Sequence, residues 1–276
     1  MRVAVAQTEP RLKENDRNLD GCIAALEQAA AERAQLLVLP ECAMSGYMFD
    51  SAEEAQPFAE EVPGPSTQAL ERECRRLGIH AVCGLLERDG DTLRNTAALV
   101  GPSGLIGTYR KTHLPFLGVD RFVRAGDELE VFDTPIGRIG IQICYDLRFP
   151  EVTRTLALRG ADLVAHPTNF PLAATPQTEF VTRARATENR VYLLTANRIG
   201  KERSAEFCGA SQIVDPHGER LTEAGSDAEA LLVAEVDLER ARNKNFVVPG
   251  EYEIYLFEHR RPELYGALVQ TTVATA

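Results

Sequence analysis

A chain of 276 residues with 44% hydrophobic and 26% charged residues has the composition of a globular protein, which excludes disordered and fibrous classes. Its 30 basic and 41 acidic residues give a net charge of −11, so the surface on average repels nucleic acid and anionic membranes. No apolar run approaches the roughly 20 residues that span a bilayer, so we expect a soluble protein with no nucleic-acid or membrane partner.

The N-terminal residues and the cysteines predict a cytoplasmic protein. Residues 1–7 run directly into a strand pattern, without the apolar segment and cleavage site of a signal peptide. The six cysteines form no CxxC pair, which fits reduced thiols better than a disulfide framework or a zinc site. They are Cys22, Cys42, Cys74, Cys83, Cys144 and Cys208.

Short apolar runs recur along the chain and alternate with helical patterns. In chain order, strands are predicted at residues 3–6, 36–39, 81–86, 95–100, 105–109, 138–143, 163–166, 191–196, 212–214 and 231–236. Helices are predicted at residues 18–33, after 65–66, and at about 150–158 and 179–189. Glycine-containing turns at 89–91 and 102–104 predict hairpins. The order indicates one α/β domain over residues 1–276, with sheets covered by helices and a frayed tail at 271–276.

Three of the predicted strands are followed by a residue with a reactive or charged side chain. The run 138–143 leads to Cys144, the run 36–39 reaches Glu41 through Pro40, and the run 105–109 precedes Lys111. Taken singly, each has a structural interpretation, because cysteine is often a packing residue and exposed charges often end strands. His113 raises the further possibility of a Cys-His pair, although nothing in the sequence places it beside Cys144.

The motifs around these residues resemble those of the nitrilase superfamily of carbon-nitrogen hydrolases. They read Leu-Pro-Glu at 39–41, Tyr-Arg-Lys-Thr-His-Leu at 109–114 and Ile-Cys-Tyr-Asp-Leu-Arg-Phe-Pro-Glu at 143–151. The similarity continues through residues 166–169 and 183–189 to 261–265. This resemblance covers nearly the whole chain and implies a four-layer α-β-β-α sandwich.

The resemblance also implies a mechanism that uses no metal or organic cofactor. Glu41 would be the general base, Lys111 the oxyanion stabiliser and Cys144 the nucleophile, with the backbone N–H of Tyr145 as a second oxyanion donor. The substrate would be a small linear amide or N-carbamoyl compound, hydrolysed through a thioester with release of ammonia. Members of the superfamily usually dimerise, so we expect a homodimer, with residues 246–276 as a C-terminal extension that is a candidate for the interface.

The chain departs from the family pattern between the lysine and cysteine motifs. Many members have a second glutamate there, but residues 115–127 contain none. Asp120 is the nearest acidic replacement as a supporting acid, and a plain surface turn with Arg121 is the alternative.

Other residues bear on the substrate. Nitrile-hydrolysing members usually have Trp-Glu after the cysteine, whereas this chain has Tyr145-Asp146 and no tryptophan, which favours the amidase-like branches. Nitrile hydrolysis and a catalytically silent scaffold remain the alternatives. Tyr47 and Asn169 lie at predicted strand-to-loop exits and are candidates for substrate binding or for packing.

Overall fold

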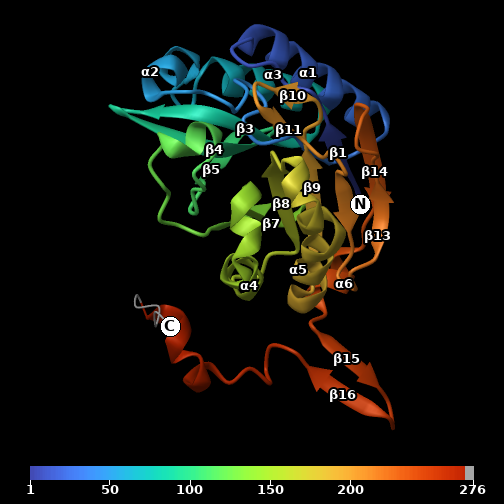
Figure 1. Ribbon diagram of the computed structural model, residues 1–276. Helices are drawn as coiled ribbons and strands as arrows, with labels where there is room; N and C mark the ends of the chain where they lie inside the picture. The colour runs from blue at the N-terminus through green and yellow to red at the C-terminus, as the bar shows by residue number, and fades with distance from the viewer. Residues whose placement is uncertain (271–276) are drawn as a thin grey trace. The chain divides into compact units, whose positions relative to one another are not determined.

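Two six-stranded sheets form the centre of the computed structural model, which describes residues 1–270 (Figure 1). The first sheet has three parallel central strands, each side of which pairs with an antiparallel strand, and a last edge strand that pairs antiparallel with its neighbour. Its spatial order is β14 (Ala230–Glu235), β1 (Arg2–Gln7), β2 (Leu36–Val38), β3 (His80–Asp89), β4 (Thr92–Gly101) and β5 (Gly104–Arg110). The frayed tail predicted at 271–276 lies outside the described residues.

The second sheet repeats this plan. Its parallel centre consists of β7, β8 and β9, again with antiparallel strands on both sides. The spatial order is β13 (Arg220–Glu223), β12 (Gln212–Val214), β9 (Tyr192–Asn197), β8 (Leu163–Thr168), β7 (Gly137–Ile141) and β6 (Val131–Thr134). Parallel centres of this kind are buried on both faces, which explains why their sequences are almost continuously apolar.

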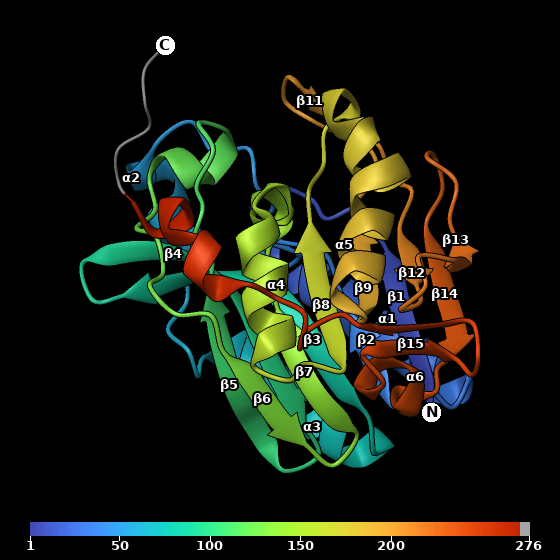
Figure 2. The same ribbon diagram turned by 90° about the horizontal axis from the view of Figure 1, so that it is seen from below.

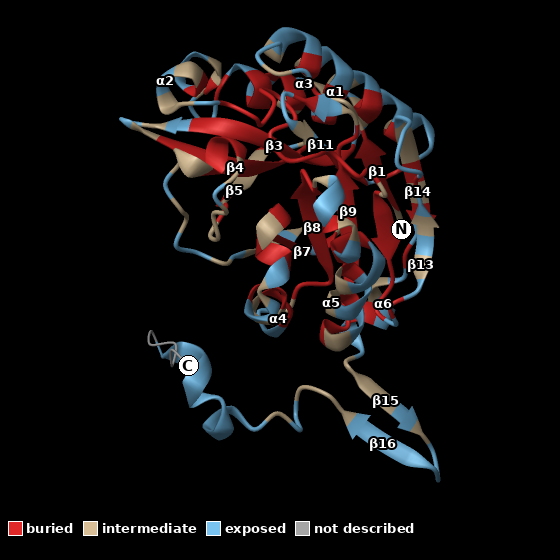
Figure 3. Cartoon of the chain, in the orientation of Figure 1, coloured by how far each residue is buried: buried red, intermediate tan, exposed pale blue. Residues whose placement is uncertain are grey.

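The sheets pack face to face and helices cover their outer faces (Figure 1). In the view from below, the helices of the second sheet lie in front of its strands (Figure 2). β1 lies against β9, and β3 lies against β8. The first sheet is covered by α1 (Asn15–Ala31) and α3 (Pro65–Leu77), and the second by α4 (Pro150–Leu158) and α5 (Thr182–Asn189). Buried residues concentrate in the central strands, while the helices expose their outer surfaces (Figure 3). The predicted four-layer α-β-β-α sandwich is therefore confirmed.

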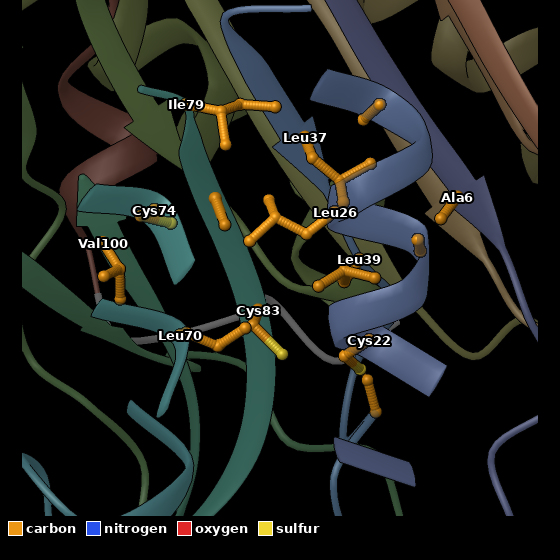
Figure 4. Close-up of a cluster of buried hydrophobic side chains, with 14 of the residues drawn as sticks. Ala6, Cys22, Leu26, Leu37, Leu39, Leu70, Cys74, Ile79, Cys83 and Val100 are labelled. Carbon is orange, nitrogen blue, oxygen red and sulfur yellow. The ribbon is translucent and has the colours of Figure 1, made fainter. Parts of the chain in front are cut away.

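A core of aliphatic side chains and thiols joins the first sheet to its helices (Figure 4). Cys22 and Leu26 of α1 are four residues apart and share one face of that helix, as do Leu70 and Cys74 of α3. They pack on strand side chains that include Leu37, Cys83 and Val100. This packing fixes the strands whose ends carry Glu41 and Lys111.

The remaining elements are short and were mostly not predicted. No residue of β6 or β13 is buried, and their sequences lack the apolar runs that marked the other strands. The others are α2 (Ala52–Ala55), α6 (Leu238–Arg242) and the two-stranded β10 (Lys201–Glu202) and β11 (Ala205–Glu206). The helix predicted at 179–189 begins as a π-helical turn, Gln177–Val181, and continues as α5.

A second compact unit begins at Asn243. It contains the hairpin of β15 (Asn245–Val248) and β16 (Tyr252–Tyr255), followed by two 3₁₀ turns, Pro262–Leu264 and Gly266–Val269. The division of the chain into a single domain with an extension from residue 246 stays a prediction. Among residues 1–270, no helix combines the length and apolarity that a membrane crossing requires.

Candidate active site

The ends of β2, β5 and β7 bring Glu41, Lys111 and Cys144 together inside the sandwich. Glu41 is fully buried and Lys111 is 1% exposed, and the Lys111 Nζ lies 2.6 Å from Glu41 Oε1. Cys144 is 7% exposed, and both charged groups act on its thiol. Burial of an ion pair is costly unless hydrogen bonds complete it, so the surroundings of this pair matter.

Asp120 and Asn95 complete the ion pair. Lys111 Nζ also donates to Asp120 Oδ2, at 2.5 Å, and Asp120 is 3% exposed on the 3₁₀ turn Gly118–Arg121. The Asn95 side-chain amide donates to Glu41 Oε1 at 2.7 Å and to Asp120 Oδ1 at 2.8 Å. The alternative of a surface turn at Asp120 is therefore wrong, because its carboxylate is a buried partner of Lys111.

Tyr47 belongs to the same network. Its hydroxyl donates to Asp120 Oδ2 at 2.7 Å, and its ring lies 5.8 Å from the Lys111 Nζ. The loop of Tyr47 is held in turn by Glu202, whose Oε2 accepts from the backbone N–H groups of Tyr47 and Met48 at 2.8 and 2.6 Å. Arg198 donates to the other oxygen of Glu202 at 2.7 Å, so this carboxylate is also paired.

Cys144 lies on a tight turn between β7 and α4. β7 ends at Ile141, two residues earlier than the predicted strand, and Cys144 begins the 3₁₀ turn Cys144–Arg148 with a φ of +47°. A left-handed conformation is unusual for a non-glycine residue and is often found at functional sites. The turn thus presents the thiol away from the strand direction.

Asp146 connects the cysteine turn to the lysine segment. Its Oδ2 accepts from the Ile143 N–H at 2.9 Å and from the Tyr109 hydroxyl at 2.7 Å. Its Oδ1 accepts from the Thr112 hydroxyl and the His113 N–H, both at 3.0 Å. The fully buried carboxylate therefore bonds to residues on both sides of Lys111 and to the residue before Cys144.

His113 is engaged with Asp146 and Phe149. Its Nδ1 lies 2.9 Å from Asp146 Oδ1, and its ring stacks on Phe149 with centroids 3.8 Å apart. Among residues 1–270, no hydrogen bond between His113 and the Cys144 thiol is present. The hypothesis of a Cys-His pair therefore has no geometric support.

Residues at the end of β8 surround the thiol from another side. The Thr168 hydroxyl and the Asn169 backbone N–H act on the Cys144 sulfur and lower its pKa. The Asn169 side-chain amide donates to the Glu41 backbone carbonyl at 3.0 Å. His166, on the same strand, lies with Nε2 3.3 Å from the Cys144 carbonyl and Nδ1 3.1 Å from the Thr195 hydroxyl.

Burial and charge set the protonation of the site. Burial raises the pKa of the Cys144 thiol well above its usual value and the Glu41 charge adds to this rise, against the effect of Lys111. Burial also raises the pKa of Glu41, with Lys111 opposing it. For Lys111, burial works to lower the pKa, but Asp120 and Glu41 outweigh it and hold the pKa above its usual range. The resting site thus contains a neutral thiol and an ammonium.

Sequence reasoning missed Asn95, Asp146 and Glu202. Asn95 stands as a polar residue at the start of a buried apolar run, and Asp146 lies within the cysteine motif, so each carried a weak signal. Glu202 carried none, because its partners Tyr47 and Met48 are more than 150 residues away. Among the described residues, no group of three or more His, Cys, Asp or Glu side chains is arranged to hold a metal ion.

Comparison with known proteins identifies the family of the chain. The family model described as carbon-nitrogen hydrolase matches residues 2–245. A nitrilase of Pyrococcus abyssi is 40% identical over 96% of this chain and 99% of its own length. An omega-amidase of Homo sapiens is 33% identical over 96% of both chains.

Solved structures of an amidase from Nesterenkonia sp. are also similar. One, with a TM-score of 0.80 and 29% identity over 98% of this chain and all of its own, has a glutamate-to-glutamine substitution and acrylamide added to its active-site cysteine. Another, with a TM-score of 0.79 and 29% identity over 96% of this chain and 95% of its own, is a cysteine-to-alanine variant in complex with butyramide. With its matching fold and the buried Glu41, Lys111 and Cys144, the chain belongs to the carbon-nitrogen hydrolase family of the nitrilase superfamily.

Proposed function

We propose that this protein hydrolyses the C–N bond of a small linear amide or N-carbamoyl compound through a thioester on Cys144. The observation that carries the proposal is the buried Glu41–Lys111 pair beside the thiol. Glu41 Oε1 is occupied by Lys111 and Asn95, whereas Oε2 has no hydrogen-bond partner among residues 1–270. The carboxylate thus keeps one oxygen for a proton.

The first half of the reaction acylates Cys144. Because its pKa is raised, the thiol is protonated at rest, and Glu41 accepts the proton as sulfur attacks the amide carbon. The Lys111 ammonium and the Tyr145 backbone N–H stabilise the oxyanion. The C–N bond then breaks, and Glu41 returns the proton to the nitrogen, which leaves as ammonia.

The second half releases the acid. Glu41 takes a proton from water as the hydroxyl attacks the thioester carbon, and Lys111 stabilises the second oxyanion. The C–S bond breaks, the sulfur regains a proton from Glu41, and the product leaves as a carboxylic acid, or as a carbamate that loses CO2 to give an amine.

Asp120 takes the place of the absent second glutamate in this proposal. Glu41 gains and loses a proton during the cycle, whereas Asp120 stays ionised. Asp120 therefore keeps an anion beside Lys111 at every step and holds its ammonium in the charged form. Tyr47, whose hydroxyl is bonded to Asp120, orients that carboxylate. Asn169 is retained as a substrate-binding residue.

Nitrile hydrolysis is the second candidate, and the 40% identical nitrilase of Pyrococcus abyssi supports it. The Tyr145-Asp146 pair after the nucleophile and the lack of tryptophan favour amides instead. Cytoplasmic location and a homodimer remain part of the proposal. Six free thiols support the cytoplasmic location. The aromatic-rich segment 246–268 supports the homodimer.

The test is ammonia release from short linear amides, ω-amino amides, N-carbamoyl amino acids and nitriles. We expect turnover of at least one amide or carbamoyl class and weaker turnover of nitriles. Cys144→Ala should abolish it, with Cys74→Ala as the control for loss of a buried thiol elsewhere. Full turnover in Cys144→Ala would refute the proposal.

The silent-scaffold alternative has its own test. If the site were inactive, iodoacetamide would label Cys144 no faster than the other buried thiols. We expect Cys144 to be labelled selectively, as measured by peptide mass spectrometry.

A further inference from the structure

Three buried side-chain oxygens on residues around the nucleophile have no hydrogen-bond partner among residues 1–270. They are Glu41 Oε2, Thr168 Oγ1 and Asn169 Oδ1. Leaving a buried acceptor unpaired costs about 1–3 kcal/mol. Proton transfer explains Glu41 Oε2, and the action of the Thr168 hydroxyl on the Cys144 sulfur explains Thr168 Oγ1. The proposed steps assign nothing to Asn169 Oδ1.

The orientation of the Asn169 side chain follows from its contacts. Its Nδ2 donates to the Glu41 backbone carbonyl, which is only an acceptor, so the other end of the amide is fixed as the oxygen. Its own backbone N–H acts on the Cys144 sulfur. Asn169 is thus in contact with Glu41 and Cys144, while its side-chain oxygen has no hydrogen-bond partner.

We propose that Asn169 Oδ1 accepts an N–H of the substrate carboxamide and makes the site selective for substrates whose leaving group carries an N–H. This rests on the proposed function. Holding one N–H on Asn169 turns the nitrogen lone pair of the tetrahedral intermediate toward the protonated Glu41 Oε2. The C–N bond breaks as the nitrogen takes this proton, and Asn169 itself is chemically unchanged.

The proposal separates amides from substrates without a leaving-group N–H. A site built to bind an N–H leaves its acceptor unpaired when an ester or nitrile occupies it, and such a substrate is disfavoured. The preference for amides over nitriles then has a cause independent of the residues that follow Cys144.

The experiment compares butyramide with p-nitrophenyl butyrate, which carries the same acyl group on a leaving group without N–H. We expect Asn169→Ala to lower kcat/KM for butyramide about 10- to 100-fold relative to that for the ester. Damage to Glu41 or Cys144 would instead lower both values alike, because both substrates need the thiol.

Two further variants complete the design. Asn169→Asp keeps an acceptor oxygen and should restore the amide-to-ester ratio, even if both rates fall. Asn18→Ala is the control, because Asn18 is a buried asparagine whose side chain bonds only to the backbone of Arg11 and Met44 among the described residues. It should leave the amide-to-ester ratio unchanged.

The outcomes distinguish failure of the role of Asn169 from failure of the proposed function. An unchanged amide-to-ester ratio in Asn169→Ala overturns the role of Asn169. If the unmodified protein neither releases ammonia from any amide nor nitrophenolate from the ester, the proposed function itself fails.

Discussion

At the scale of single residues, the site combines two opposite demands on Cys144. Burial and the Glu41 charge favour the neutral thiol, while Lys111, Thr168 and the Asn169 N–H favour the thiolate. The neutral form is stable at rest, and the thiolate forms only as its proton moves to Glu41. Reactivity is therefore coupled to the presence of a base.

Replacing Glu41 tests this balance. Glu41→Gln removes the base, so amide turnover should fall about 10³-fold. The substitution also removes the negative charge of Glu41, which raises the pKa of Cys144, and leaves the positive charge of Lys111, which lowers it. The pKa of the thiol should therefore fall. Alkylation of Cys144 by iodoacetamide, followed against pH, should then have its midpoint at lower pH than in the unmodified protein.

The control is Glu235→Gln, whose carboxylate lies on the outer strand β14 and is largely exposed. It should change neither turnover nor the alkylation profile. An alkylation midpoint that moves to higher pH in Glu41→Gln would contradict the assigned electrostatics.

At the scale of elements, the side chain of Asp146 connects the end of β5 to the end of β7 by hydrogen bonds. Because it accepts from Tyr109, Thr112 and His113 as well as from Ile143, displacement of the cysteine turn would break contacts with the lysine segment. Asp146 thus helps to hold the nucleophile and the oxyanion stabiliser at a fixed distance.

Asp146→Asn tests this coupling. The variant places an amide NH₂ among several donors, so we expect the free energy of unfolding to fall by about 2–4 kcal/mol. Turnover should fall through kcat more than through KM, because misalignment affects the transition state most. Asp133→Asn, on the exposed strand β6, is the matched control.

Strand ends were predictable because their causes are local. The apolar run 36–39 stopped by Pro40 placed Glu41, and the run 105–109 placed Lys111. The strand predicted at 138–143 extended two residues too far, because the chain leaves β7 after Ile141 and enters the turn that begins at Cys144. Asn95 could not be assigned a role, because its partners lie 54 and 25 residues away and only the folded sheet brings them together.

At the scale of the whole molecule, the buried site affects stability. His166 lies between Cys144 and Thr195, and burial lowers its pKa to about 4. The folded protein therefore holds the ring neutral at pH values where the unfolded chain, with a usual histidine pKa of 6.5, takes up a proton. Protons favour the unfolded state as the pH falls from 6.5 to about 4.

His166→Gln isolates this contribution. Above pH 6.5 the neutral histidine carries no titration penalty, and below it the penalty grows to about 3 kcal/mol at pH 4. The stability advantage of the unmodified protein over the variant, measured by urea unfolding, should thus shrink by that amount on acidification. A difference that is constant with pH would contradict the neutral, buried ring.

The central claim is that Cys144 carries the acyl group. The direct measurement is acid quenching of the protein during turnover of butyramide, followed by peptide mass spectrometry. We predict a butyryl group on the peptide that contains Cys144, its removal by hydroxylamine, and its absence in Cys144→Ala. An acyl group on another residue, or butyramide hydrolysis retained in Cys144→Ala, would contradict the account.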